Sequence, residues 1–322
     1  MKIPAHTFKK LALASVIAGA SFAANADIVT SVKPLGFIAS SIADGVLNTD
    51  VIVPAGASPH DYSLKPTDVQ KVKNADVFLW IGEDVDSFLE KTADSLDKNK
   101  VIEISHFDEI KPLLGTSSHH HHHHDHDEAD EHHHDHDHAK HEDEHEHEHE
   151  LETNWHIWYS PAISKVVAQK VADKLTSLYP AQKEKIAQNL AQFNQSLDQQ
   201  GEQIKAELAG VQGKGFYVFH DAYGYFNDAY GLKQTGAFTI NPLVAPGAKT
   251  LAKIKEEILE HKVNCLFAEP QFTPKVIESL QKNTNVNVGQ LDPLGEKVAL
   301  GKDSYARFLK ATADSYKACL AK

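Results

Sequence analysis

Short apolar runs alternate with amphipathic stretches through the first third of the chain. The apolar runs are rich in β-branched and aromatic residues, which favours buried strands. These strand candidates cover residues 27–32, 49–54, 76–82 and 100–105. The stretches between them have helical spacing and cover residues 34–45, 65–75 and 86–96. Strand–helix alternation of this kind predicts βαβ units around a mainly parallel sheet.

The same alternation returns in the last third of the chain. Strand candidates there cover residues 216–220, 263–270 and 286–293. Helix candidates cover residues 249–262, 273–282 and 303–322. The fold class that we expect is therefore α/β, with two lobes that each contain a mainly parallel sheet.

Residues 181–209, between the two halves, have the pattern of one long helix. The segment contains no proline and a single glycine, Gly201, and its apolar residues recur at helical spacing. Such a helix would be about 43 Å long, which predicts a rigid link rather than a flexible one. We expect an N-terminal lobe over residues 27–180, the linking helix over 181–209, and a C-terminal lobe over 210–322.

The first 26 residues have the features of a secretory signal peptide. Lys2, Lys9 and Lys10 precede a short apolar run, and the stretch 24–26 supplies small residues where a signal peptidase cuts. The mature chain is therefore expected to begin at Asp27. We expect a soluble, exported protein of the periplasm without a lipid anchor.

Cys265 and Cys319 are the only cysteines in the chain. An oxidising compartment favours their pairing in a disulfide. Two buried free thiols are the alternative, because the sequence does not supply the distance between the two Cα atoms.

The net charge of −13 comes almost entirely from one stretch, residues 119–150. This tract contains 13 acidic residues and one lysine, so it carries −12 and leaves the rest of the chain nearly balanced. No basic patch indicates nucleic-acid binding. Because the tract has almost no apolar residues to bury, we expect a disordered insertion over about residues 116–152.

The tract also holds most of the histidines, interleaved with carboxylates. Imidazoles that are mostly neutral near pH 7 coordinate metal ions, and the carboxylates attract cations, so we interpret the tract as an accessory, low-affinity site for metal capture. A solvated spacer is the alternative, whereas a purification tag would not need the interleaved acids. The accessory ligands are His119, His120, His121, His122, His123, His124, His126, His132, His133, His134, His136, His138, His141, His145, His147 and His149.

Three histidines outside the tract have more specific settings. His60 lies in a loop rich in proline and glycine after a strand candidate, His156 lies between Trp155 and Trp158, and His220 ends a strand candidate. Ligands in open α/β sheets bind beyond the carboxyl ends of strands, where His60 and His220 should project. Three imidazoles with a carboxylate or a water molecule suit Zn²⁺. On spacing alone, loop or core histidines are an equally good interpretation.

Carboxylates accompany these histidines at the predicted strand ends. Glu269 and Asp292 each follow or end a strand candidate of the second half. Glu269, Asp221 or Asp61 could accept a hydrogen bond from the second ring nitrogen of a histidine ligand. No metalloprotease, serine-hydrolase or P-loop motif occurs, and no convincing dinucleotide-binding motif, so we expect no enzyme.

Several stretches resemble one family closely. They are VKPLGFIASSIADG (32–45), VPAGASPHDYSLKPTDV (53–69), YVFHDAYGYF (217–226), FAEPQF (267–272) and LDPLG (291–295). Through them the chain is similar to zinc-specific periplasmic binding proteins of ABC importers, the ZnuA type of metal-binding solute-binding proteins, over essentially the whole mature chain. The resemblance implies two lobes joined by one long helix, a metal cleft between the lobes, and a monomer that delivers Zn²⁺ to a membrane permease.

The resemblance also implies particular site residues. The cleft histidines of the family fall on His60, His156 and His220. Asp292 matches an acidic residue that binds the metal in manganese-binding relatives and lies near it in zinc-binding ones. Pro59 stands where some members have a carboxylate, so water or Asp292 must complete the coordination. Ala237 replaces a histidine that some members use for a second site.

Three other functions compete with zinc uptake. A manganese-binding member of the same family would share the fold. A zinc hydrolase would also have three histidines and an open coordination position. In a periplasmic zinc buffer, the histidine-rich tract would be the main site and the two lobes a scaffold.

Overall fold

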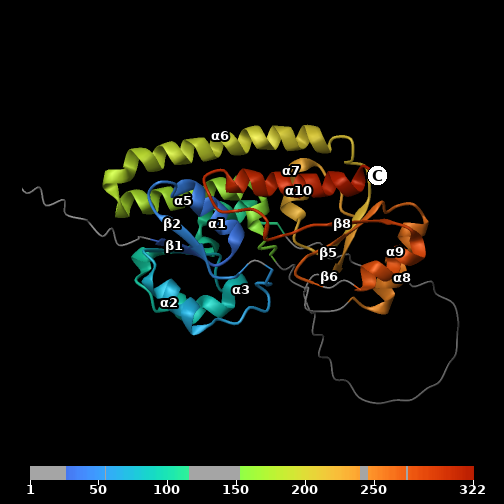
Figure 1. Cartoon of the computed structure of the whole chain (residues 1–322), viewed down its shortest axis with the longest axis horizontal. Helices are drawn as coiled ribbons and strands as arrows, with labels where there is room; N and C mark the ends of the chain where they lie inside the picture. Colours follow the sequence, from blue (N-terminus) through green and yellow to red (C-terminus); the bar gives the residue numbers. More distant parts are fainter. Residues whose placement is uncertain (1–26, 55, 116–152, 240–245, 273–274) are drawn as a thin grey trace, which may run out of the picture.

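The computed structural model describes residues 27–54, 56–115, 153–239, 246–272 and 275–322 (Figure 1). The predicted signal peptide and the histidine-rich tract, with all of its accessory ligands, lie outside these residues. Within the described ranges, no helix is both long enough and apolar enough to cross a membrane.

The first lobe is built on a parallel four-stranded sheet in the order β2-β1-β3-β4. Its strands are β1 (Asp27–Thr30), β2 (Asn48–Val51), β3 (Val77–Trp80) and β4 (Val101–Glu103). Its α-helices are α1 (Lys33–Ile42), α2 (Pro66–Asn74), α3 (Glu83–Asp86) and α4 (Glu90–Asp94). Short 3-10 helices are η1 (Ser87–Leu89), η2 (Lys98–Lys100), η3 (Ile104–His106) and η4 (Asp108–Leu113). The strand β3 is buried at all four positions, as expected for a parallel sheet covered on both faces.

The second lobe repeats this arrangement, with a parallel sheet in the order β6-β5-β7-β8. Its strands are β5 (Phe216–His220), β6 (Gly236–Thr239), β7 (Cys265–Ala268) and β8 (Asn287–Gln290). Its helices are α7 (Gly224–Tyr230), α8 (Ala248–Leu259), α9 (Lys275–Thr284) and α10 (Ser304–Leu320). The predicted α/β fold with two parallel sheets is confirmed.

Four helical elements join the two sheets. They are η5 (Ile157–Tyr159), α5 (Pro161–Leu178), η6 (Pro180–Gln182) and the long helix α6 (Lys183–Leu208). The helix α5 starts cleanly because the Ser160 side chain accepts a hydrogen bond from the Ile163 backbone N–H and Pro161 occupies the first turn. The predicted long linking helix is confirmed as α6, which lies along both lobes (Figure 1).

The C-terminal helix α10 does not stay within its own lobe. It packs against α6 and against α1 of the first lobe. Phe37 and Phe308 place their ring centroids 5.2 Å apart across this contact, and the Tyr159 ring lies 5.1 Å from that of Phe308. A single apolar cluster therefore continues from one lobe into the other. The predicted disulfide is also present, with 6.1 Å between the Cα atoms of Cys265 on β7 and Cys319 on α10.

Several elements differ from the pattern-based prediction. The helix expected over residues 86–96 is divided into α3, η1 and α4. Asp86, at the end of α3, turns its buried carboxylate back to accept a hydrogen bond from the Ile81 backbone N–H. The helices α5 and α7 and the edge strand β6 were not predicted. Two of the four residues of β6, Gly236 and Ala237, have a low preference for strands, so this strand has a weak signal in the sequence.

Candidate metal centre

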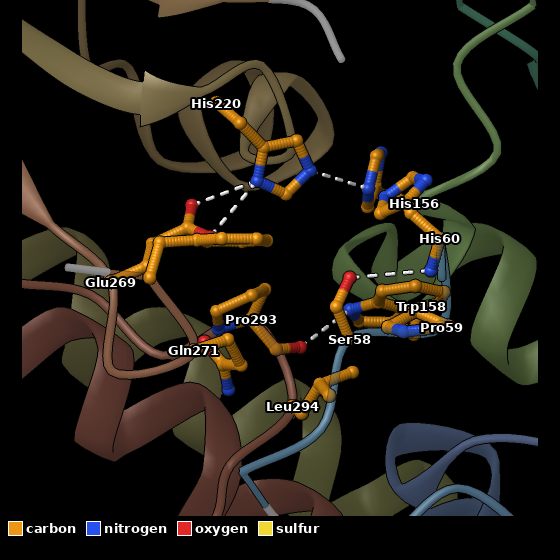
Figure 2. A pocket seen from close by; sticks show the side chains of 11 residues that line it. Ser58, Pro59, His60, His156, Trp158, His220, Glu269, Gln271, Pro293 and Leu294 are labelled. Carbon is orange, nitrogen blue, oxygen red and sulfur yellow. Dashed lines mark hydrogen bonds and ion pairs between the residues drawn. The ribbon is translucent and has the colours of Figure 1, made fainter. Parts of the chain in front are cut away.

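Three of the predicted ligands come together in a pocket between the lobes (Figure 2). His60 lies in the loop after β2, His156 lies just before η5, and His220 is the last residue of β5. Each imidazole offers one nitrogen, and these three nitrogens all lie within 4.8 Å of one another. The ring centroids of His156 and His220 are 4.8 Å apart. Those of His60 lie 5.8 Å from His156 and 5.4 Å from His220.

The imidazole of His220 is held by a buried carboxylate. Its Nδ1 lies 2.9 and 3.0 Å from the two carboxylate oxygens of Glu269, the residue that follows β7. The hydroxyl of Tyr223 donates to the same carboxylate at 3.0 Å. Because a carboxylate can only accept, His220 carries its hydrogen on Nδ1. Its Nε2 is then directed into the pocket.

The imidazole of His156 is held by an amide. Its Nδ1 lies 2.8 Å from Oδ1 of Asn154, and the same oxygen accepts the His156 backbone N–H at 3.0 Å. Nε2 of His156 therefore also faces the pocket, where it lies 3.0 Å from Nε2 of His220. Two nitrogen lone pairs at this distance repel one another unless a hydrogen or a cation lies between them. The donor set therefore fits a metal ion.

His60 is held less firmly than the other two histidines. Its backbone N–H donates to the Ser58 hydroxyl at 3.2 Å, while the residue as a whole is exposed. Desolvation of its ring, and secondarily the charge on His220, lower the pKa of His60 to about 4. Desolvation also holds the pKa of His156 well below its usual range, with the charges of His220 and His60 as smaller causes. Both imidazoles are therefore neutral at pH 7, which is the form that binds metal.

Apolar side chains enclose the three imidazoles. Trp158, Phe272, Pro293 and Leu294 line the pocket. The indole N–H of Trp158 donates to the Pro293 carbonyl at 3.0 Å, and its ring stands edge-on to that of His156 with centroids 5.3 Å apart. This bond connects a loop of the second lobe to the first lobe beside the three histidines.

The structure places the remaining predicted site residues elsewhere. The Asp292 carboxylate accepts hydrogen bonds from the backbone N–H groups of Leu294 and Glu296 and from the Gln271 amide, and it does not line the pocket. Asp221 Oδ1 accepts a bond from Gln234. Asp61 is exposed beside His60.

The remaining histidines in the described ranges, His106 and His261, lie on the surface. His106, in η3, lies 3.4 Å from a Glu103 oxygen and is largely exposed. His261 follows α8 with a left-handed φ of 57° and is exposed.

Asn154, whose side chain contacts His156, was not among the site residues predicted from the sequence. Its signal is weak, because an asparagine two residues before a candidate ligand is common in loops. The contact becomes evident only from the fold, since the amide also lies against the backbone of the second lobe.

The chain matches known proteins over nearly its full length. Residues 28–319 match the family described as zinc-uptake complex component A, periplasmic. The high-affinity zinc uptake system protein ZnuA of Haemophilus influenzae is 68% identical, covering 97% of this chain and 98% of that protein. The protein of the same name from Haemophilus ducreyi is 55% identical and covers 97% and 99%. A crystal structure of ZnuA that is 23% identical superposes with a TM-score of 0.72, covering 92% of this chain and 99% of that one, and this likeness supports the fold.

Proposed function

Because the chain belongs to the family of periplasmic zinc-uptake complex component A proteins, we propose that it captures Zn²⁺ in the periplasm and delivers it to the membrane permease of an ABC importer. The family contributes the substrate-binding component of an uptake system, which is a transport role rather than a catalytic one. One observation carries the proposal: imidazoles from both lobes offer three nitrogens within 4.8 Å of one another.

The proposed ligands are His60, His156 and His220. Three imidazoles would fill three of the four positions that Zn²⁺ prefers, and they suit it better than the harder Mn²⁺. The Asp292 carboxylate already accepts three hydrogen bonds, two from backbone N–H groups of its own loop and one from the Gln271 amide in the loop after β7. It would have to give these up to reach the metal, which favours water as the fourth ligand. Glu269 accepts a hydrogen bond from Nδ1 of His220 and so fixes the orientation of this imidazole.

The wider organisation of the protein follows the same proposal. The mature chain would begin at Asp27 after export, with lobes over 27–180 and 210–322 and a linking helix over 181–209. The histidine-rich tract would hold zinc weakly near the cleft. In this arrangement the tract raises the local supply of zinc, and the three-histidine site retains it.

Zinc titrations of the mature chain test the proposal. The variants are a deletion of residues 119–150, His60→Ala, and His106→Ala as a matched control on an exposed histidine outside the site. Competition with a chromophoric chelator reports the tightest site, and calorimetry reports the stoichiometry. The same titration with Mn²⁺ tests the choice of metal.

We expect His60→Ala to weaken the tightest site strongly and His106→Ala to leave it unchanged. The deletion should leave the tightest site intact and lower the number of zinc ions bound. If tight binding disappears with the tract, the protein is a zinc buffer and the proposal is wrong. Tighter binding of Mn²⁺ than of Zn²⁺ at neutral pH would overturn the choice of metal.

A further inference from the structure

The side-chain amide of Asn154 is buried at the boundary between the lobes, and both its oxygen and its nitrogen make hydrogen bonds there. The residue is 5% exposed. Its Oδ1 accepts from both Nδ1 and the backbone N–H of His156. Its Nδ2 donates to the backbone carbonyl of Asp221, which follows His220, at 3.4 Å. One amide therefore contacts a ligand of the first lobe and the backbone next to a ligand of the second lobe.

The backbone of Asn154 is fixed as firmly as its side chain. Its N–H donates to the Gly115 carbonyl at 2.9 Å, and its carbonyl accepts the Tyr225 hydroxyl at 2.7 Å. The same hydroxyl accepts the Gly115 N–H at 2.9 Å. Tyr225 belongs to α7 of the second lobe, so this lobe holds Asn154 through both its side chain and its backbone. With the backbone fixed in this way, the side-chain amide cannot turn without breaking its own hydrogen bonds to His156 and to the Asp221 carbonyl.

The orientation of this amide determines which nitrogen of His156 faces the pocket. Oδ1 is identified as the acceptor because it receives the backbone N–H of His156. Nδ1 of His156 must then be the donor, and Nε2 keeps its lone pair for the metal. Without the amide oxygen, the ring could carry its hydrogen on either nitrogen and could rotate about its side-chain bonds.

We propose that Asn154 is a positioning residue for zinc, which fixes the tautomer and direction of His156 and sets its spacing from His220. The inference rests on the proposed function, because it assigns a role within the same site. Partners behind a metal-binding histidine change metal affinity by about ten- to a hundredfold when they are removed. Asn154 has the same relation to His156 that Glu269 has to His220, but it supplies a neutral amide and a contact between the lobes.

Variants of the mature full-length chain separate positioning from general support of the fold. Asn154→Ala removes the acceptor, and Asn154→Asp keeps an acceptor oxygen. Asn189→Ala is the matched control, since Asn189 is also 5% exposed and donates to the carbonyls of Ile42 and Asp44, away from the site. Zinc affinity is measured by chelator competition. One equivalent of Co²⁺ gives visible absorption bands that report the geometry of the tightest site.

We expect Asn154→Ala to weaken zinc binding about ten- to a hundredfold and to change the Co²⁺ bands. Asn154→Asp should recover most of the affinity, and Asn189→Ala should lower the melting temperature without altering affinity or bands. The inference is overturned if Asn154→Ala binds both metals as the wild type does, or if Asn154→Asp is as weak as Asn154→Ala. If the wild type itself fails to bind zinc tightly, the proposed function has failed instead.

Discussion

Replacing Glu269 with glutamine tests whether the Glu269 carboxylate strengthens His220 as a metal ligand. The substitution changes the shape of the side chain very little. The side chain is 1% exposed and accepts from Nδ1 of His220 and from the Tyr223 hydroxyl. Glutamine keeps an oxygen that can accept from Nδ1, but it removes the negative charge that strengthens the imidazole as a ligand. Loss of this charge should weaken zinc binding, within the range of about ten- to a hundredfold that mutation of such partners causes. This corresponds to about 1.4 to 2.7 kcal/mol of binding free energy.

The alanine variant at the same position should behave differently. Glu269→Ala leaves the Nδ1–H of His220 and the hydroxyl of Tyr223 buried without this acceptor. Each such donor costs about 1 to 3 kcal/mol, so the zinc-free protein should lose stability as well as affinity. Glu269→Gln should therefore separate zinc affinity from stability, whereas Glu269→Ala should lower both.

The assays are chelator competition for zinc affinity and urea unfolding of the zinc-free protein for stability. Glu257→Gln is the matched control, because Glu257 accepts a hydrogen bond from Tyr217 in a similar tyrosine–glutamate pair away from the pocket. We expect this control to bind zinc normally. Wild-type zinc affinity in Glu269→Gln would refute the argument that the carboxylate acts through His220.

Four further predictions follow: two concern pH, one the disulfide and one the contact between the lobes. The pKa of about 4 at His60 lies below the ordinary value of 6.5, so the unfolded chain binds the extra proton first as pH falls. The contribution of His60 to the stability of the zinc-free protein should be complete above pH 6.5 and should decline as pH falls towards 4. Urea unfolding across that range would measure this decline. A free energy of unfolding that does not change with pH would contradict the prediction. The zinc site should also lose affinity at lower pH than the histidine-rich tract does, as measured by titration of the wild type and the tract deletion. The double variant Cys265→Ala/Cys319→Ala removes the disulfide, which joins residues 54 positions apart in the sequence. Because the unfolded chain gains conformational entropy, the free energy of unfolding should fall by about 4 kcal/mol. A double variant that unfolds in urea as the wild type does would contradict this prediction. Trp158→Phe keeps an aromatic ring but removes the hydrogen bond to the Pro293 carbonyl. Zinc should then dissociate faster in stopped-flow measurements. An unchanged dissociation rate would show that this bond does not keep the two lobes together around the metal.

The fold was predictable because its pattern is local. Buried parallel strands appear as short apolar runs, and α6 appears as a long stripe of apolar residues without a proline. The helix α5, which was not predicted, has a comparable signal: Ile163, Val167, Val171 and Leu175 are spaced four apart, and all are buried. The packing of α10 on the first lobe was not predictable, because an apolar helix face does not specify its partner.

Some residues of the site were easier to predict from the sequence than others. His60, His156 and His220 stood out once the tract was set aside, since each lies in a loop or at a strand end. Glu269 follows a strand, which made it a candidate partner. Asn154 acts through contacts with the second lobe, far away in the sequence, and an amide two residues before a ligand does not indicate such contacts.

The apolar core explains how ligands from two lobes can form one site. A zinc site tolerates only about 0.2 Å of variation in its ligand distances, so the lobe that carries His156 and the lobe that carries His220 must keep a fixed relative position. If α6 were the only connection, the two lobes could change their relative orientation when this one helix bends. The helix α10 removes that freedom, because its Phe308 ring packs against Phe37 and so ties the second lobe to the first. Polar contacts such as the Trp158–Pro293 hydrogen bond then adjust the final spacing at the cleft. The sixteen histidines of the tract are close together in sequence, but it is this shared core that brings the three histidines of the pocket within coordinating distance.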